Sequence, residues 1–142
     1  IGAGRMFAPG APHKWRKENW RRSPVTQDRE RHARAQGLVL ENPRLALAGP
    51  TVGWIAAALD AVEGFAQPRA LAHVRAPIAI IAAGRESIVD NDRTEAIARL
   101  LPDATFTRIE GAKHEIMMER DEYRAQFWAA FDALAARVAP AA

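Results

Sequence analysis

The second half of the chain alternates between runs with the pattern of strands and runs with the pattern of helices. Residues 77–83 form an apolar run, and residues 104–109 alternate apolar with polar side chains, as a half-buried strand does. Apolar residues at helical spacing follow over 91–101 and from Asp121 onward. This order predicts two parallel strands joined by a right-handed crossover. The stripe of the last helix holds Tyr123, Phe127, Phe131, Leu134 and Val138.

The first half of the chain shows only helical patterns. Residues 13–20 are basic and aromatic and are expected to form a short helix. The next helix is expected to begin at Ser23-Pro24, with Thr26 as a second candidate cap. It should run to Gln36, because Gly37 is a typical terminator.

A further helix is expected after Thr51, which would be its N-cap. Its apolar face would hold Trp54, Ala58, Ala61 and Phe65, and Gly64 and Pro68 would mark its end. These patterns divide the chain into a helical region, residues 1–68, and a βαβα region, residues 69–142.

The composition is that of an ordinary globular protein and excludes several kinds of chemistry. The 142 residues, 49% hydrophobic and 26% charged, suffice for one modest domain. The lack of cysteine excludes disulfides, thiolate chemistry and cysteine zinc sites. No apolar run approaches the roughly 20 residues of a membrane helix, and the first residues lack the basic head and apolar run of a signal peptide.

Two strands are too few for a stable parallel sheet, because such a sheet needs cover on both faces. The chain also has no initiator methionine. We therefore expect a piece of a longer protein, in which residues before Ile1 supply most of the sheet.

The net charge of +3 is unevenly distributed. Residues 1–40 hold nine basic and three acidic side chains, so they carry +6, which leaves −3 for the remainder. Such a segment could meet phosphate groups on nucleic acid or lipid. Because no nucleic-acid-binding motif accompanies the charge, we favour a solvated helical surface and expect no nucleic-acid partner.

Both predicted strands run into loops that carry chemically useful side chains. Residues 84–90 carry carboxylates, and residues 111–115 carry a single histidine, His114. Because the carboxyl ends of neighbouring parallel strands meet at one edge of a sheet, an acid and a base are expected to come together there. The spacing between Glu86 and His114 leaves room for one helix and one strand.

Other titratable residues have simpler interpretations. The histidines without a neighbouring acid loop are predicted to lie at the surface, namely His13, His32 and His73. Glu115 and Glu119 are expected to cap the following helix or to form ion pairs with it.

Several segments, in their joint order and spacing, resemble the C-terminal half of an α/β-hydrolase, specifically the bacterial lysophospholipase and monoacylglycerol-lipase-like branch. The resemblance covers the chain from about Asn19 to Arg137 and implies an α/β fold. The implied fold is the C-terminal part of a doubly wound, mostly parallel sheet, with a helical cap inserted after the sixth strand. Residues 1–68 would form the cap and residues 69–142 the core. The segments are Thr26-Gln27-Asp28-Arg29-Glu30-Arg31, Asn42-Pro43, Gly49-Pro50-Thr51-Val52-Gly53-Trp54, Gly84-Arg85-Glu86-Ser87-Ile88-Val89-Asp90-Asn91 and Gly111-Ala112-Lys113-His114-Glu115-Ile116.

The resemblance implies ester hydrolysis by a Ser-His-acid triad in which His114 is the base. In the family's loop the acid precedes x-[Ile/Val]-Val, a position that Glu86 holds here, and Asp90 is the alternative acid. The family's serine lies in Gly-x-Ser-x-Gly, but Ser23 and Ser87 have no such glycines. The serine and the oxyanion hole are therefore expected upstream, and this chain alone is expected to be inactive.

The aromatic residues of the helical half allow two interpretations each. Trp54 and its helix face would line an acyl-chain pocket or belong to the core. Trp15 and Trp20, flanked by basic residues, would touch a lipid interface or pack the cap on the core.

The resemblance implies no metal and no organic cofactor.

The resemblance implies a serine hydrolase that cleaves carboxylic esters, most simply lysophospholipids or monoacylglycerols. Two alternatives stay open: another chemistry of the same fold (peptidase, epoxide hydrolase or dehalogenase), or a non-catalytic basic helical module that binds an anionic surface. Expected partners are the N-terminal half of the same fold, a small lipid or ester substrate and, through peripheral contact, a membrane surface. The expected location is the cytoplasm, including the face of the inner membrane.

Overall fold

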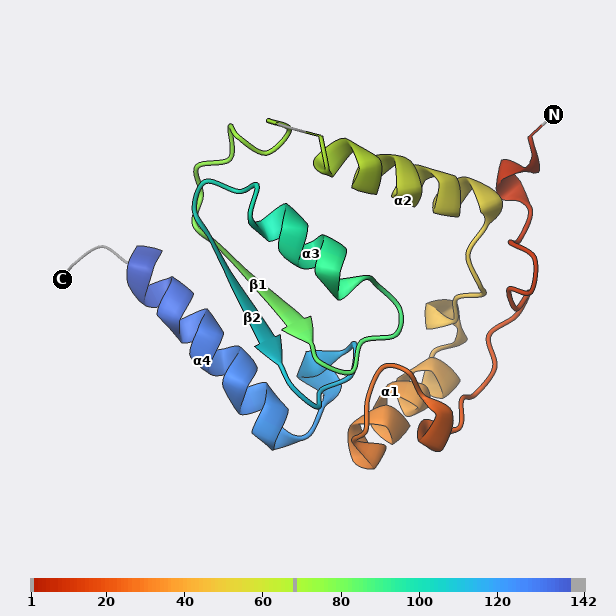
Figure 1. Ribbon diagram of the computed structural model, residues 1–142. Helices are drawn as coiled ribbons and strands as arrows, with labels where there is room; N and C mark the ends of the chain where they lie inside the picture. The colour runs from red at the N-terminus through yellow and green to blue at the C-terminus, as the bar shows by residue number, and fades with distance from the viewer. Residues whose placement is uncertain (1, 68, 139–142) are drawn as a thin grey trace.

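A pair of parallel strands lies at the centre of the computed structural model, which describes residues 2–67 and 69–138 (Figure 1). The strands are β1 (Ile78–Ala83) and β2 (Ala104–Ile109). Ile78 pairs with Ala104 at one end, and Ala83 pairs with Ile109 at the other. Both predicted strands and their parallel direction are confirmed.

Two helices flank the strand pair, one on either side in Figure 1: α3 (Asn91–Ala98) and α4 (Asp121–Val138). Both helices contact both strands. The predicted start of the last helix at Asp121 is confirmed. The core lies where the ends of the strands meet the loop after β2. Its buried members are Ala83, Ile109, Ala112 and Ile116, against which Ile81, Tyr123 and Phe127 pack.

The helix between the strands is shorter than the pattern over 91–101 predicts, since α3 ends at Ala98. The N–H of Leu100 bonds to the carbonyl of Ile97, three residues back, so the helix tightens into a turn. Pro102 follows and cannot continue a helix.

The helical half begins with two short 3₁₀ turns, η1 (Ala3–Arg5) and η2 (Trp20–Arg22), and continues with α1 (Arg29–Glu41), η3 (Pro43–Leu45) and α2 (Val52–Phe65). The prediction of a short helix over residues 13–20 is wrong, because only η2 forms, at the end of this range.

The expected bounds of α1 are also wrong at both ends. Asp28 is the N-cap, and its side chain accepts a hydrogen bond from the N–H of Arg31 at 2.9 Å. Ser23 and Thr26 are buried, and neither is the N-cap of α1. Gly37 lies inside α1, which continues to Glu41 and stops two residues before Pro43, where the backbone can no longer stay helical.

Thr51 is confirmed as the N-cap of α2, because its hydroxyl accepts a hydrogen bond from the N–H of Trp54 at 3.2 Å. No residue of α2 is buried, and Trp54 and Phe65 of its apolar face are exposed. An apolar hollow of about 480 Å³ separates α2 from α3.

Over the described ranges, no helix has both the length and the apolar character needed to cross a bilayer.

Of the three histidines predicted to lie at the surface, His13 and His73 are exposed, but His32 is 4% exposed. The segment before η2 folds back on α1 and covers it. Glu18 donates its N–H to the side chain of Gln36, and its carboxylate lies 3.8 Å from Nε2 of His32. Burial of His32 therefore comes from residues distant in the chain, which a local pattern does not reveal.

Candidate active site

An acid–histidine pair lies at the carboxyl ends of the two strands. Glu86 comes from the loop after β1, and His114 comes from the loop after β2. Oε2 of Glu86 lies 2.7 Å from Nδ1 of His114. The Glu86 side chain is 5% exposed, whereas that of His114 is 29% exposed, so the acid is enclosed and the imidazole reaches the surface.

Two glycines allow close packing around the acid and histidine loops. Gly111 has φ of +85°, and a Cβ there would lie 2.8 Å from the hydroxyl of Tyr123. At Gly84, a Cβ would lie 2.7 Å from the Cα of Glu110. A larger residue at Gly84 would push the two loops apart, and a larger residue at Gly111 would clash with the ring of Tyr123 in α4.

The second oxygen of the Glu86 carboxylate is held by the backbone of its own loop. Oε1 accepts hydrogen bonds from the N–H groups of Ser87 at 2.7 Å, Ile88 at 2.6 Å and Val89 at 3.3 Å. Burial, the largest influence, raises the pKa of Glu86, but the Ile88 N–H, His114 and the other two N–H groups together outweigh it. The pKa of Glu86 therefore lies below its ordinary value of 4.5, and the carboxylate is charged at neutral pH.

Asp90, the alternative acid, has a different role. Its Oδ1 accepts hydrogen bonds from the N–H groups of Asp92 at 2.9 Å and Arg93 at 3.1 Å, so it is the N-cap of α3. The structure brings Glu86, and not Asp90, to His114.

Neither serine of the chain is placed to be activated by His114. The Ser23 side chain is buried, and its Oγ accepts a hydrogen bond from the N–H of Val25 at 3.4 Å. Ser87 is exposed beside Glu86 and uses its backbone N–H to hold that carboxylate. In residues 2–67 and 69–138, the only hydrogen bond of the His114 ring is the one to Glu86.

Trp54 lines an open apolar hollow of about 670 Å³. The hollow is bordered by the segment before α2 and by Ile88 of the acid loop, and Glu86 and His114 are not part of its wall. Its lining is mostly apolar, which suits a hydrocarbon chain better than a polar group.

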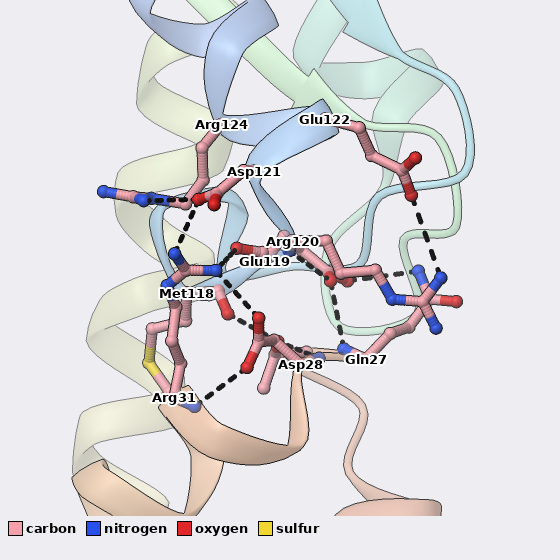
Figure 2. Close-up of polar contacts among 10 residues, drawn as sticks. Gln27, Asp28, Arg31, Met118, Glu119, Arg120, Asp121, Glu122 and Arg124 are labelled. Atoms are coloured by element: carbon pink, nitrogen blue, oxygen red, sulfur yellow. Dashed lines mark hydrogen bonds and ion pairs between the residues drawn. The ribbon is translucent and has the colours of Figure 1, made fainter.

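Two polar residues near His114 were not identified from the sequence. Glu119 is completely buried, and its carboxylate accepts hydrogen bonds from Gln27 (Figure 2). It also accepts one from the Lys113 N–H, in the loop that carries His114. The expectation that Glu119 caps the next helix or forms an ion pair with it is therefore wrong. No local signal reveals this role, because Gln27 lies 92 residues away in the chain.

The polar groups present do not form a metal site: within the described part of the chain, no three His, Asp or Glu side chains are grouped so that they could hold an ion. The chemistry that the geometry supports is proton transfer. A charged, enclosed carboxylate on Nδ1 fixes the orientation of the imidazole, while Nε2 has no partner within the described residues.

Comparisons with known proteins show the family and the fold of the chain. The sequence model of a family described as serine aminopeptidase, S33, matches residues 3–121. A probable lysophospholipase L2 of Haemophilus influenzae is 37% identical over 84 residues, which are 59% of this chain and 26% of that protein.

A crystal structure of a soluble variant of monoglyceride lipase from Saccharomyces cerevisiae, in complex with a substrate analog, has a similar fold. The TM-score is 0.63 at 15% identity, over 84% of this chain and 42% of the lipase. The chain thus spans less than half of either relative, and the expected fold class, a partial α/β-hydrolase, is confirmed. The chain belongs to the serine aminopeptidase S33 family of α/β-hydrolases.

Proposed function

We propose that the protein is a serine hydrolase of carboxylic esters, with lysophospholipids or monoacylglycerols as substrates. His114 is its general base and Glu86 is the acid that orients it. The observation that carries the proposal is the 2.7 Å contact between Glu86 Oε2 and His114 Nδ1, at the carboxyl ends of two parallel strands. Similarity to a probable lysophospholipase supports the choice of substrate class.

In the proposed reaction, Nε2 of His114 takes the proton of a serine hydroxyl while the serine oxygen attacks the ester carbonyl carbon. The tetrahedral intermediate collapses, and the imidazolium returns the proton to the leaving alcohol. Water then attacks the acyl-enzyme with His114 again as the base, which releases the fatty acid and restores the serine. Glu86 stays charged throughout and stabilises the imidazolium.

The serine is proposed to come from residues upstream of this chain, in a Gly-x-Ser-x-Gly turn, together with the oxyanion hole. Residues 1–68 would form the cap and residues 69–142 the end of the core. The chain alone would then be inactive. This division is supported by the fraction of each relative that the chain spans.

The acyl chain is proposed to lie in the hollow lined by Trp54 and Ile88. Its apolar lining and its position beside the acid loop support this assignment. Contact with a membrane surface through the basic first 40 residues would bring lipid substrates to the site.

The test uses the full-length protein, with lysophosphatidylcholine and a monoacylglycerol as ester substrates and an aminoacyl p-nitroanilide as the amide substrate. The expected result is ester hydrolysis that falls by orders of magnitude in His114→Ala, and labelling by a fluorophosphonate at a serine outside residues 1–142. Normal ester turnover by His114→Ala would contradict the proposal.

The family's description gives a second candidate function, aminopeptidase activity, which uses the same triad on an amide. Amide cleavage without ester cleavage in the same assay would replace the first proposal by the second. An aspartate at the upstream turn would instead indicate epoxide hydrolase or dehalogenase chemistry.

A further inference from the structure

The segment that leads into α1, residues 23–28, is fastened to the loop that carries His114. The two segments are about 90 residues apart in sequence, and both main-chain and side-chain groups take part. The joining hydrogen bonds run from Lys113 Nζ to the Ser23 carbonyl at 2.6 Å, from the Glu115 N–H to the Val25 carbonyl at 2.8 Å, and from the Thr26 hydroxyl to the Met118 carbonyl at 2.7 Å. The chain is therefore tied down on both sides of His114.

Glu119 lies at the centre of this junction and is completely buried. Its Oε1 accepts hydrogen bonds from the Lys113 N–H at 2.9 Å and from Gln27 Nε2 at 3.3 Å. Its Oε2 accepts hydrogen bonds from the Gln27 N–H at 3.1 Å and the Arg120 N–H at 3.3 Å, and Figure 2 shows Gln27 and Arg120 beside it. Four N–H donors on two oxygens suit an ionised carboxylate and no other side chain.

Gln27 links this junction to both loops of the candidate site. Its Nε2 donates to the carbonyl of Gly111 at 2.7 Å, three residues before His114. Its Oε1 accepts a hydrogen bond from Nη1 of Arg85 at 2.8 Å, and Arg85 directly precedes Glu86. One side chain at the start of α1 therefore contacts both the histidine loop and the acid loop.

Arg31 holds the first turn of α1 in place around this junction. Nη1 donates to the Asp28 carboxylate at 2.8 Å and to the carbonyl of Glu119 at 2.7 Å, and Nη2 donates to Asp121 at 2.6 Å. In Figure 2 the guanidinium lies between these groups. The hydrogen bonds from Arg31 and Arg124 lower the pKa of Asp121. The position of Gln27 is thus fixed by the first turns of two helices.

We propose that Glu119 and Gln27 are positioning residues for the His114–Glu86 pair, an inference that rests on the proposed hydrolase function. Neither side chain touches the imidazole. They act through the backbone of Gly111 and Lys113, which set the path of the chain into His114. Loss of either link lets the imidazole shift relative to Glu86, and a displacement of about 1 Å at a catalytic group costs up to about 100-fold in rate.

The experiment compares Glu119→Gln and Gln27→Ala with a matched control, Glu122→Gln, in the full-length enzyme. Glu122 is three residues further along, with a side chain 61% exposed. An amide at position 119 puts an NH₂ against N–H donors in either orientation. We expect kcat on a monoacylglycerol to fall by about 10-fold to 100-fold in Glu119→Gln and by about 10-fold in Gln27→Ala, with KM within about twofold. Glu122→Gln should match the wild type.

Thermal melting of each variant shows whether it is folded at the assay temperature. If Glu119→Gln does not fold, Gln27→Ala decides, because Gln27 is only half-buried and no charge is removed. Wild-type kcat in folded Gln27→Ala, or a change confined to KM, would overturn the positioning role while leaving the hydrolase proposal intact. Activity retained by His114→Ala would instead overturn the hydrolase proposal itself.

Discussion

Replacing Glu86 by glutamine removes one charge and, on this structure, also reverses the tautomer of His114. Oε1 of Glu86 accepts three backbone N–H groups at 2.6–3.3 Å. The amide oxygen of the variant must stay on that side, because an NH₂ there would face three donors. The NH₂ therefore faces Nδ1 of His114, where it can only donate. The imidazole proton moves to Nε2, and the base can no longer accept the serine proton.

This change should lower kcat by about 10⁴-fold, the cost of holding a catalytic histidine in the wrong tautomer. At about 1.36 kcal/mol for each factor of ten, the loss of transition-state stabilisation is about 5.4 kcal/mol. The control is Asp90→Asn, an acid-to-amide change four residues away. Asparagine is as good an N-cap as aspartate, so kcat should stay within about twofold of the wild type.

Both variants are assayed as full-length enzymes with a short-chain p-nitrophenyl ester, and KM, kcat and the melting temperature are measured. A loss below about 10-fold in folded Glu86→Gln would refute the tautomer argument. A larger loss in Asp90→Asn than in Glu86→Gln would move the acid role to Asp90.

Three further predictions concern stability and substrate binding. Because the pKa of Glu86 is lowered in the folded state, its contribution to the free energy of unfolding is present above its ordinary pKa of 4.5 and is lost as the pH falls through the native pKa. In urea unfolding over this range, the free energy of unfolding should therefore decline less steeply with falling pH in Glu86→Gln than in the wild type. Gly111 has φ of +85° and lies against Tyr123, so Gly111→Ala should lower the free energy of unfolding by about 1–3 kcal/mol. Gly37 lies in open space inside a helix, so Gly37→Ala should raise it by about 0.5–1 kcal/mol. Urea unfolding of both variants measures the two effects. Trp54→Ala should raise KM for long-chain esters while a short-chain ester keeps its kcat/KM, and equal effects on both substrates would contradict the acyl-chain assignment.

The βαβα half could be predicted because its signals are local. Apolar runs of strand length, helical stripes and the proline after Leu101 fix both strands and the order of the helices. Parallel pairing then brings two loops to one edge, which is why an acid of the first loop could be paired with His114 from the sequence. The remaining choice between Glu86 and Asp90 depended on the position of each carboxylate within a single loop.

The helical half resisted prediction because contacts far apart in sequence override local preference there. Ser23 and Thr26 are good capping residues, but both are buried against the histidine loop, and the cap passes to Asp28. His32 is covered by a segment that folds back from before η2. From the sequence, Glu119 is expected to cap the next helix or to form an ion pair with it, and only the fold surrounds it with N–H donors.

The central claim is that Glu86 holds His114 with its proton on Nδ1 and leaves Nε2 ready to accept one. Nitrogen-15 NMR of the full-length protein labelled at histidine, with His114 assigned by comparison with His114→Ala, distinguishes the two neutral tautomers directly. The account predicts that neutral His114 carries its proton on Nδ1, hydrogen-bonded to Glu86, and that Glu86→Gln moves this proton to Nε2. A wild-type His114 with its proton on Nε2 would contradict it.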